Sequence, residues 1–228
     1  ILTPTERLRD LLISWSINPD KVHTIRNAIA MPKLDVKKSR REIRAKLGVD
    51  EEVKLIVFHG VLTNYYNVES LRHLKRISKI ISKQVGKIKF LIIGNYERVP
   101  VNDESFIYTG YVENLYEYLS AADFAILPIF YNSLGIRSRL LDYFAMAVPV
   151  LTTPVGVTGM KFACDSGGVV VRNNIEELAQ SAIALVRSPT RLEKMREGSK
   201  ELIKWFSPEK VAEDLVSVYS QVIRADLK

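Results

Sequence analysis

The chain has 228 residues, of which 47% are apolar and 26% are charged. This length and balance predict one large folded domain with a sizeable core. A single cysteine, Cys164, excludes a framework of internal disulfides and is typical of a reducing compartment. No apolar run reaches the length of a membrane span and no signal-peptide pattern is present, so we expect a cytoplasmic protein, free or held at the inner face of a membrane.

The formal net charge is +7, and the excess of Lys and Arg lies in residues 37–46 and 72–89. Such stripes attract nucleic acid or anionic lipid. Neither an aromatic-interleaved basic strand nor a recognition helix accompanies them, which favours solvated helix faces over specific nucleic-acid binding. Peripheral contact with a membrane stays open.

Strands and helices alternate along the chain. A helix is expected to begin at Thr3 as its cap, with Pro4 in the first turn and Glu6 three residues on. The predicted strands are 22–25, 54–58, 89–93, 106–108, 124–127, 148–151 and 168–171. The other predicted helices are 39–47, 67–85, 115–120, 137–146, 175–186, 189–206 and 208–224. Near-continuous apolar strands joined by helices predict an α/β fold, a Rossmann-like three-layer sandwich with a mainly parallel sheet, followed by C-terminal helices.

Three glycines, Gly60, Gly94 and Gly110, come at the ends of successive predicted strands. Glycine allows positive φ or close approach of a ligand to the backbone, and any one of them is explained by a turn alone. Together, at one edge of a parallel sheet, they favour a nucleotide cleft. Neither a G-x-G-x-x-G fingerprint nor a phosphate loop is present, which argues against a dinucleotide oxidoreductase or an NTPase.

Two arginines, Arg137 and Arg139, stand where a helix is predicted to open after the strand 124–127. Positive charge is unfavourable in the first turn of a helix, and a bound anion would relieve the conflict. Asp142 shares a helical stripe with Arg139, which suits a phosphorylated ligand that also carries hydroxyl groups. A surface ion pair between Arg139 and Asp142 explains the same spacing and stays open. His59 lies at a strand end in this cleft, and a structural role is favoured for it.

Taken in order, these segments resemble the C-terminal, nucleotide-sugar-binding half of GT-B-fold glycosyltransferases, in particular the large retaining family four (group 1). The resemblance covers nearly the whole chain. Its segments are residues 3–6 and 25–29 (T-x-S-E and I-P-N-G-V), 58–60 with 67–69 (F-x-G and P-N-V), 108–112 with 118–123 (G-x-V and Y-x-x-A-D), 135–150 (G-T-R-L-K-x-L-E-A-M-A-x-G-x-P-V) and 155–160 (V-G-x-E-G-L).

The resemblance implies roles for single residues. Arg137 and Arg139 match the catalytic basic pair that faces the donor diphosphate, and Asp142 matches the glutamate that binds the ribose. Gly60 matches the loop beside the phosphates, and Tyr111 and Val112 match the segment near the base. The chain departs from the family pattern at three places: the shorter Asp142, Leu134 in place of an earlier glutamate, and residues 61–66, which lack the arginine and lysine that many members carry there.

The implied activity is transfer of a glycosyl group from a nucleoside-diphosphate sugar, whose base the sequence leaves unknown. The acceptor, a sugar or lipid-linked sugar, would be held by an N-terminal domain outside this chain, and neither a cofactor nor a metal is expected. The expected organisation is an interdomain helix and linker (1–34), a donor-binding domain (35–206) and a crossing helix (207–228). We expect this chain to be a fragment that does not transfer sugar alone. A non-catalytic nucleotide-sugar-binding module and a sugar-nucleotide epimerase-like GT-B protein are the alternatives.

Overall fold

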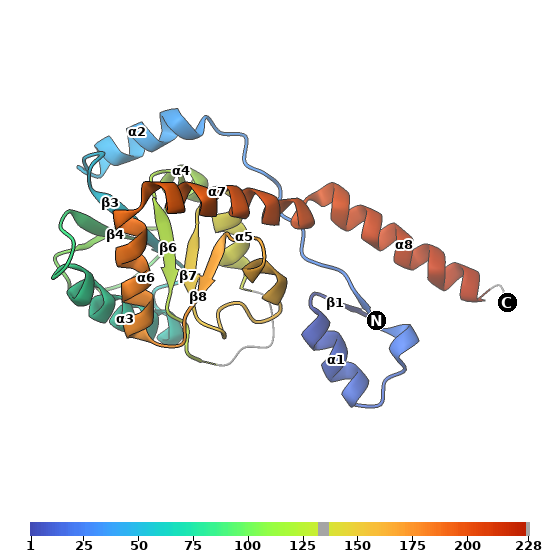
Figure 1. The fold of residues 1–228 in the computed structure, drawn as a ribbon. Coiled ribbons are helices and arrows are strands. Elements are labelled where there is room, and N and C mark those ends of the chain that lie inside the picture. Colours follow the sequence, from blue (N-terminus) through green and yellow to red (C-terminus); the bar gives the residue numbers. More distant parts are fainter. Residues whose placement is uncertain (132–136, 227–228) are drawn as a thin grey trace.

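The computed structural model describes residues 1–131 and 137–226 (Figure 1). Its centre is a six-stranded parallel sheet in the order β5-β4-β3-β6-β7-β8, which confirms the predicted fold class. The strands are β3 (Lys54–His59), β4 (Ile88–Ile93), β5 (Phe106–Gly110), β6 (Phe124–Leu127), β7 (Val150–Thr152) and β8 (Val169–Val171). Every predicted strand of this sheet is present, with bounds shifted by two residues or fewer.

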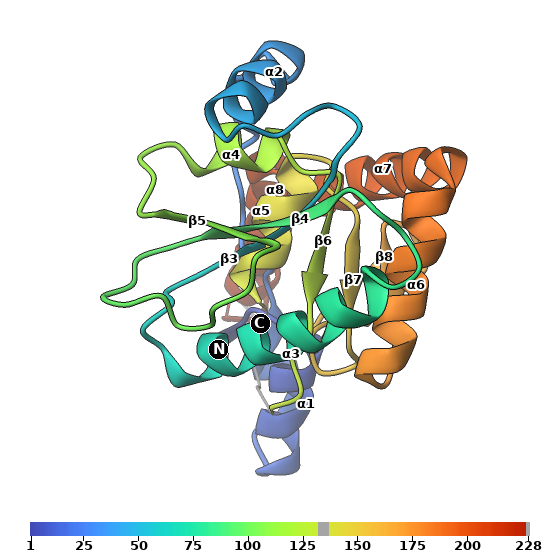
Figure 2. The same cartoon turned by 90° about the vertical axis from the view of Figure 1, so that its left-hand side faces the viewer.

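Helices cover both faces of the sheet. Figure 2 shows α3 (Tyr65–Ile81) and α6 (Ile175–Arg187) in front of the sheet and α5 (Ser138–Ala145) behind it. The remaining helices of this domain are α2 (Val36–Lys46), α4 (Leu115–Ser120) and α7 (Pro189–Ile203). The inner positions of β3, β4 and β6 are fully buried, as near-continuous apolar strands of a covered parallel sheet must be.

The order of the strands reverses between β3 and β6. From β3 the chain moves outward through β4 to β5, then returns to β6 on the other side of β3 and continues to β7 and β8. The two strands pair in parallel, with Ile56 opposite Phe124. In open α/β sheets, ligands bind at the carboxyl ends of the strands where this reversal occurs.

The first helix begins later than the sequence predicted. Thr3 lies in a short strand, β1 (Leu2–Thr3), which pairs with β2 (His23–Thr24). The cap of α1 (Glu6–Ser14) is Thr5, whose hydroxyl accepts a 3.1 Å hydrogen bond from the backbone N–H of Leu8. The prediction of Thr3 as the cap was wrong because Thr3 pairs with Thr24 in a parallel strand, a long-range contact that the local signal does not include.

Other helices begin or end at residues that differ from the predicted bounds. α2 begins at Val36, three residues before its predicted start, and the side chain of Asp35 caps it; Asn64 caps α3. The prediction through Val85 was too long because a turn follows Ile81, in which the N–H groups of Gln84 and Val85 both donate to the Ile81 carbonyl. Three short 3₁₀ helices were not predicted: Pro19–Lys21, Lys161–Cys164 and Lys204–Phe206.

The chain ends in α8 (Pro208–Asp226), which extends away from the sheet in Figure 1, on the side where α1 also lies. Its exposed apolar side chains include Val216, Tyr219 and Ile223. Among the described residues, no helix combines the length and hydropathy that a membrane crossing requires. The domain boundaries at residues 34 and 206 stay predictions.

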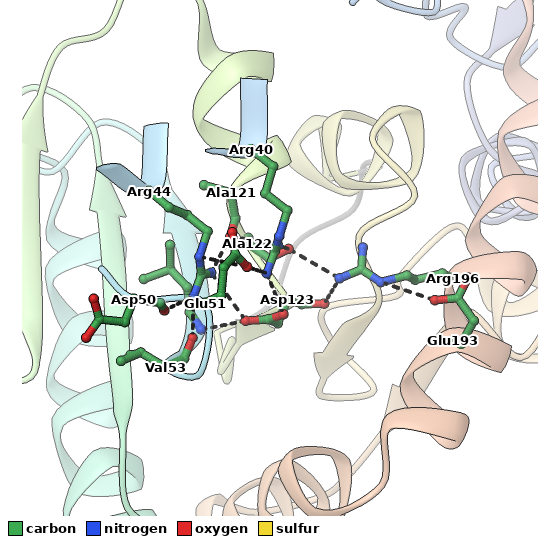
Figure 3. Close-up of polar contacts among 11 residues, drawn as sticks. Arg40, Arg44, Asp50, Glu51, Val53, Ala121, Ala122, Asp123, Glu193 and Arg196 are labelled. Carbon is green, nitrogen blue, oxygen red and sulfur yellow. Dashed lines mark hydrogen bonds and ion pairs between the residues drawn. The ribbon is translucent and has the colours of Figure 1, made fainter. Parts of the chain in front are cut away.

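A network of three arginines surrounds Asp123 at the amino-terminal end of β6 (Figure 3). The Asp123 side chain accepts hydrogen bonds from Leu55 N–H at 2.8 Å and from Arg40 Nη2 at 3.1 Å. Arg44 is 1% exposed; its Nη1 donates to the Ala121 carbonyl at 2.9 Å and lies 3.7 Å from Asp123 Oδ2. Arg196 of α7 donates to the Asp123 carbonyl at 3.0 Å. The network joins α2, β3, β6 and α7.

Much of the basic stripe at 72–89 is already paired. Arg72 bonds Glu69 at 2.8 Å, Arg76 lies 3.8 Å from Glu176, and Lys87 bonds Glu52 at 2.5 Å. Lys75 and Lys89 donate to backbone carbonyls. This arrangement is that of solvated helix and strand faces, as the sequence predicted.

Replacing Asp123 by Asn should lower the free energy of unfolding by about 3 kcal/mol, because the charges of Arg40 and Arg44 lose a buried partner while the shape is kept. Urea denaturation measures the change. Glu193→Gln, which removes an exposed partner of Arg196, is the matched control and should change stability by less than about 1 kcal/mol. Equal effects of the two substitutions would contradict the structural role of Asp123.

Candidate functional site

The predicted site residues gather at the carboxyl ends of β3, β4, β5 and β6. Gly60 follows β3, Gly94 follows β4, and Gly110 ends β5. Arg137 and Arg139 lie at the start of α5, the helix after β6. The structure therefore brings the glycines and the arginines to one edge of the sheet, at the reversal of strand order.

The three glycines lie at neighbouring strand ends that backbone hydrogen bonds connect. Gly60 N–H donates to the Ile93 carbonyl, and Gly94 N–H donates to the Gly110 carbonyl, each at 3.0 Å. A Cβ on Gly94 would meet the Gly60 carbonyl at 1.8 Å, so packing of two backbones requires glycine there. Gly110 has φ of +71° and open space around it, so its turn requires glycine. These two positions have reasons in the fold, independent of a ligand.

Gly60 is different because its close neighbour is a charged side chain. A Cβ on Gly60 would lie 2.7 Å from Nη2 of Arg139. The same Nη2 donates a 2.8 Å hydrogen bond to Oδ1 of Asn67, whose Nδ2 donates to the Val61 carbonyl at 2.8 Å. The guanidinium also lies over the Phe58 ring, 5.0 Å from its centroid. Glycine at 60 and asparagine at 67 thus fix the position of Arg139.

Arg137 is the residue that caps α5, with an extended backbone, rather than a residue of its first turn. The sequence prediction was one residue too early here, because the helix begins at Ser138. The Arg137 guanidinium lies over the Tyr131 ring at 4.7 Å. Arg139 is the second residue of the helix, so one cation rather than two lies in the first turn.

Both arginines have buried nitrogen atoms that lack partners. Nε and Nη2 of Arg137 and Nη1 of Arg139 are buried and make no hydrogen bond within the described residues. Burial lowers the pKa of Arg139, and the neighbouring charge of Arg137 lowers it further. A buried guanidinium donor without an acceptor is costly, so this site is short of negative charge.

Asp142 does not form the ion pair that the spacing allowed. Its Oδ1 accepts a 3.2 Å hydrogen bond from the Tyr116 hydroxyl, and its Oδ2 lies 3.7 Å from Nε2 of His59. In the described part of the chain, Asp142 and Arg139 come no closer than the 4.0 Å limit for an ion pair. Burial raises the pKa of Asp142, although Tyr116 and Arg139 act in the opposite direction.

His59 lies beneath these charged groups. Burial lowers its pKa to about 3, and the charge of Arg139 adds to the shift. Its backbone N–H donates to the hydroxyl of Tyr143 at 3.1 Å, while its Nε2 is buried and makes no hydrogen bond to the described residues. A neutral imidazole with one unused polar atom therefore faces the same space as Asp142.

Of the remaining predicted residues, Tyr111 and Val112 directly follow β5. Tyr111 is 76% exposed, and Val112 is half-buried against the core. Leu134 and Gly135 lie outside the described residues. Sequence reasoning missed four contributors that connect segments far apart in the chain: Asn67, Tyr116, Tyr131 and Tyr143. The P-N-V resemblance at residues 67–69 was the one signal that marked Asn67.

Two hollows are found elsewhere in the molecule. One of about 1050 Å³ lies between the first 24 residues and α8. The other, of about 290 Å³, lies between the start of α3 and residues 128–131. Arg139 and Asp142 line neither of them.

The imidazole of His59 should stay neutral from pH 8 to pH 5, because its folded pKa is about 3 against an ordinary value of 6.5. NMR titration of its Cε1–H resonance measures this. In the unfolded chain the His59 imidazole takes up a proton near pH 6.5, whereas in the folded protein it stays neutral. The contribution of His59 to the free energy of unfolding should therefore fall as pH drops from 6.5 toward 3. His59→Gln should flatten that part of the stability profile. A titration midpoint near 6.5 would contradict the burial of a neutral ring.

Comparisons with known proteins agree with this geometry. The family model described as "Glycosyl transferases group 1" matches residues 53–188, which is more than half of the chain. A comparison with curated protein sequences gave no match.

Several solved structures share the fold. One is WaaG, a glycosyltransferase involved in lipopolysaccharide biosynthesis, at 14% identity and a TM-score of 0.72, covering 95% of this chain and 61% of that one. A glycosyltransferase from Rickettsia africae gives 16% identity and a TM-score of 0.76, covering 97% and 63%. Anabaena HepE in complex with UDP gives 10% identity and a TM-score of 0.76, covering 96% and 63%. The chain spans about three-fifths of the length of these proteins. The sheet and the residues at the reversal of strand order agree with the matching family model. This chain therefore belongs to the group 1 glycosyltransferases.

Proposed function

We propose that this chain binds the nucleoside-diphosphate sugar donor of a glycosyltransferase, at the carboxyl ends of β3 and β6. The observation that carries the proposal is the group of buried, unpartnered guanidinium nitrogens on Arg137 and Arg139. A diphosphate supplies both the negative charge and the acceptor oxygens that these donors lack.

The surroundings of the arginines suit an anion in two further ways. Gly60 allows the Arg139 guanidinium to lie close to the backbone after β3, since a Cβ there would be 2.7 Å from Nη2. The start of α5 directs free N–H groups toward the same edge of the sheet. Negative charge that builds on the diphosphate as it leaves the sugar would be stabilised by cations already in place, which is the catalytic role we propose for both arginines.

Asp142 and the segment 110–112 complete the proposed donor site. Asp142 is placed by Tyr116 and is half-buried, so its free lone pairs suit the ribose hydroxyls. Tyr111 and Val112 continue from β5 at the neighbouring strand end, where a base would lie. Solved structures of Anabaena HepE and of TarM from S. aureus contain UDP, which makes UDP the first probe to use.

We propose that sugar transfer needs a second domain that holds the acceptor. Alignment of donor and acceptor contributes several kcal/mol to such reactions, up to about 7–11 kcal/mol in favourable cases. Transfer by the isolated chain is therefore not expected. A sugar or lipid-linked sugar as the acceptor and the absence of a metal requirement stay expectations of the resemblance, which leaves the base and the sugar of the donor unknown. A non-catalytic module would bind the same donor through the same residues.

Replacing Arg139 or Arg137 by Ala should weaken UDP binding by about 1.5–3 kcal/mol each, the range for hydrogen bonds to charged groups. Isothermal titration calorimetry measures the change. Arg191→Ala, an exposed arginine at the start of α7, is the matched control and should leave affinity unchanged. Unchanged affinity in both site variants would refute the diphosphate assignment.

Replacing Asp142 by Asn should reduce the preference of the protein for UDP over 2′-deoxy-UDP, because the charged acceptor for the ribose hydroxyls is lost. The fold should melt at nearly the same temperature, since burial already disfavours the carboxylate charge. Calorimetry with the two nucleotides, together with a melting curve, separates these effects. A lower melting temperature with an unchanged preference would indicate that Asp142 is structural.

A further inference from the structure

The guanidinium of Arg137 lies over an aromatic ring. Its carbon Cζ is 4.7 Å from the centroid of the Tyr131 ring. Its Nε and Nη2 atoms are buried and have no hydrogen-bond partner among residues 1–131 and 137–226. Arg139 differs, since its Nη2 donates a 2.8 Å hydrogen bond to Asn67. The two cations of the proposed diphosphate site are therefore placed by different means.

The Tyr131 ring also stacks on a second tyrosine. The ring centroids of Tyr66 and Tyr131 are 4.3 Å apart, and their planes are inclined by 26°. Because Tyr66 occupies one face of the Tyr131 ring, the guanidinium of Arg137 takes the other face. These three side chains form a stack that begins on α3 and ends at the cap of α5.

The first ring of the stack is supported by the start of α3. Tyr66 is the second residue of this helix. Its backbone N–H donates a 2.9 Å hydrogen bond to the side chain of Asn64, which caps the helix, and its carbonyl accepts a 3.1 Å hydrogen bond from the hydroxyl of Ser70. The backbone that carries the Tyr66 ring is therefore fixed, although the side chain is half exposed.

The segment that leads to Tyr131 is held from the neighbouring strand. The hydroxyl of Thr153, directly after β7, donates to the carbonyl of Ile129, and Ile129 N–H donates to the Leu127 carbonyl at 3.0 Å. The Ile129 side chain is fully buried. These contacts fix the chain two residues before Tyr131, and the contact with Tyr66 then sets the position of its ring.

An aromatic ring can orient a guanidinium without using its hydrogen-bond donors. Cation–π attraction acts on the flat face of the group, whereas the five N–H donors lie in its plane. A carboxylate in the same place would accept those hydrogen bonds and neutralise the charge. Tyr131 therefore leaves both the charge and the donors of Arg137 available to an anion.

We propose that Tyr131, supported by Tyr66, is a positioning residue that sets the guanidinium of Arg137 for the donor diphosphate. The inference rests on the proposed function and adds to it a residue that acts through another side chain. The ring of Tyr131, and not its hydroxyl, performs this role, because the contacts with both neighbours are made by the faces of the ring.

Calorimetry with UDP tests this role on a set of variants. Tyr131→Leu, which removes the ring, should weaken binding about tenfold, the scale of a sheltered cation–π contact. Tyr131→Phe keeps the ring and should stay within about twofold of the wild type. Tyr66→Leu removes the support of the ring and should weaken binding about threefold. Tyr219→Leu, at an exposed tyrosine on α8, is the matched control and should change nothing. A melting curve of each variant checks the fold.

A double-mutant cycle shows whether Tyr131 acts through Arg137. In an Arg137→Ala background, Tyr131→Leu should weaken UDP binding by less than about twofold, because the group that the ring positions is already absent. An equal loss in both backgrounds would overturn the proposal, since Tyr131 would then act on the ligand or on the fold directly. A loss as large in Tyr131→Phe as in Tyr131→Leu would also overturn it.

The same variants separate this inference from the donor assignment. If Arg137→Ala weakens UDP binding and Tyr131→Leu does not, the donor site stands and the positioning role is wrong. If neither Arg137→Ala nor Arg139→Ala weakens binding, the donor assignment is wrong, and the role of Tyr131 is wrong with it. Should Tyr131→Leu lower the melting temperature, Tyr66→Leu provides the second test, and unchanged UDP affinity in that variant would overturn the proposal.

Discussion

The carboxylate of Asp123 is the constraint on which the rest of the domain depends. It is 4% exposed and accepts hydrogen bonds from the β3 backbone at Leu55 and from Arg40 of α2. Since β3 and β6 are the two strands between which the sheet order reverses, this residue fixes their register at one end. The opposite ends of the same two strands carry His59 and the segment that leads to α5. The buried carboxylate of Asp123, at the amino-terminal ends of these strands, therefore helps to position the site at their carboxyl ends.

The two ends of this strand pair differ in how fully their buried guanidinium groups are bonded. At the amino-terminal end, Arg40 and Arg44 donate to a carboxylate and to carbonyl oxygens, and Nε of Arg44 is the one buried nitrogen of this pair without a hydrogen bond to the described residues. At the carboxyl end, Arg137 and Arg139 keep buried nitrogens without partners in the described residues. The first arrangement favours the folded chain by itself, whereas the second costs stability until an anion arrives. An anion bound between Arg137 and Arg139 would offset this cost, and Asp123 already supplies a negative charge to Arg40 and Arg44 at the other end.

Much of the fold followed from the sequence because local patterns determine it. Apolar runs such as residues 124–127 place strands, and a chain of strand and helix in alternation permits few topologies. The gathering of Gly60 and Arg139 at one edge was predictable for the same reason. The positions of Asn67, Tyr116 and Tyr143 were not, because each acts through a contact 26 to 84 residues away that no local pattern encodes. The cap at Thr5 was missed because a long-range strand pair overrode a local signal at Thr3.

Tyr131 connects the start of α3 to the proposed donor site. Its ring packs on Tyr66 on one side and beneath Arg137 on the other, so a shift of the ring moves a cation of the proposed diphosphate site. A ligand that holds Tyr66 and Tyr131 in their stacked arrangement therefore also holds Arg137 in position.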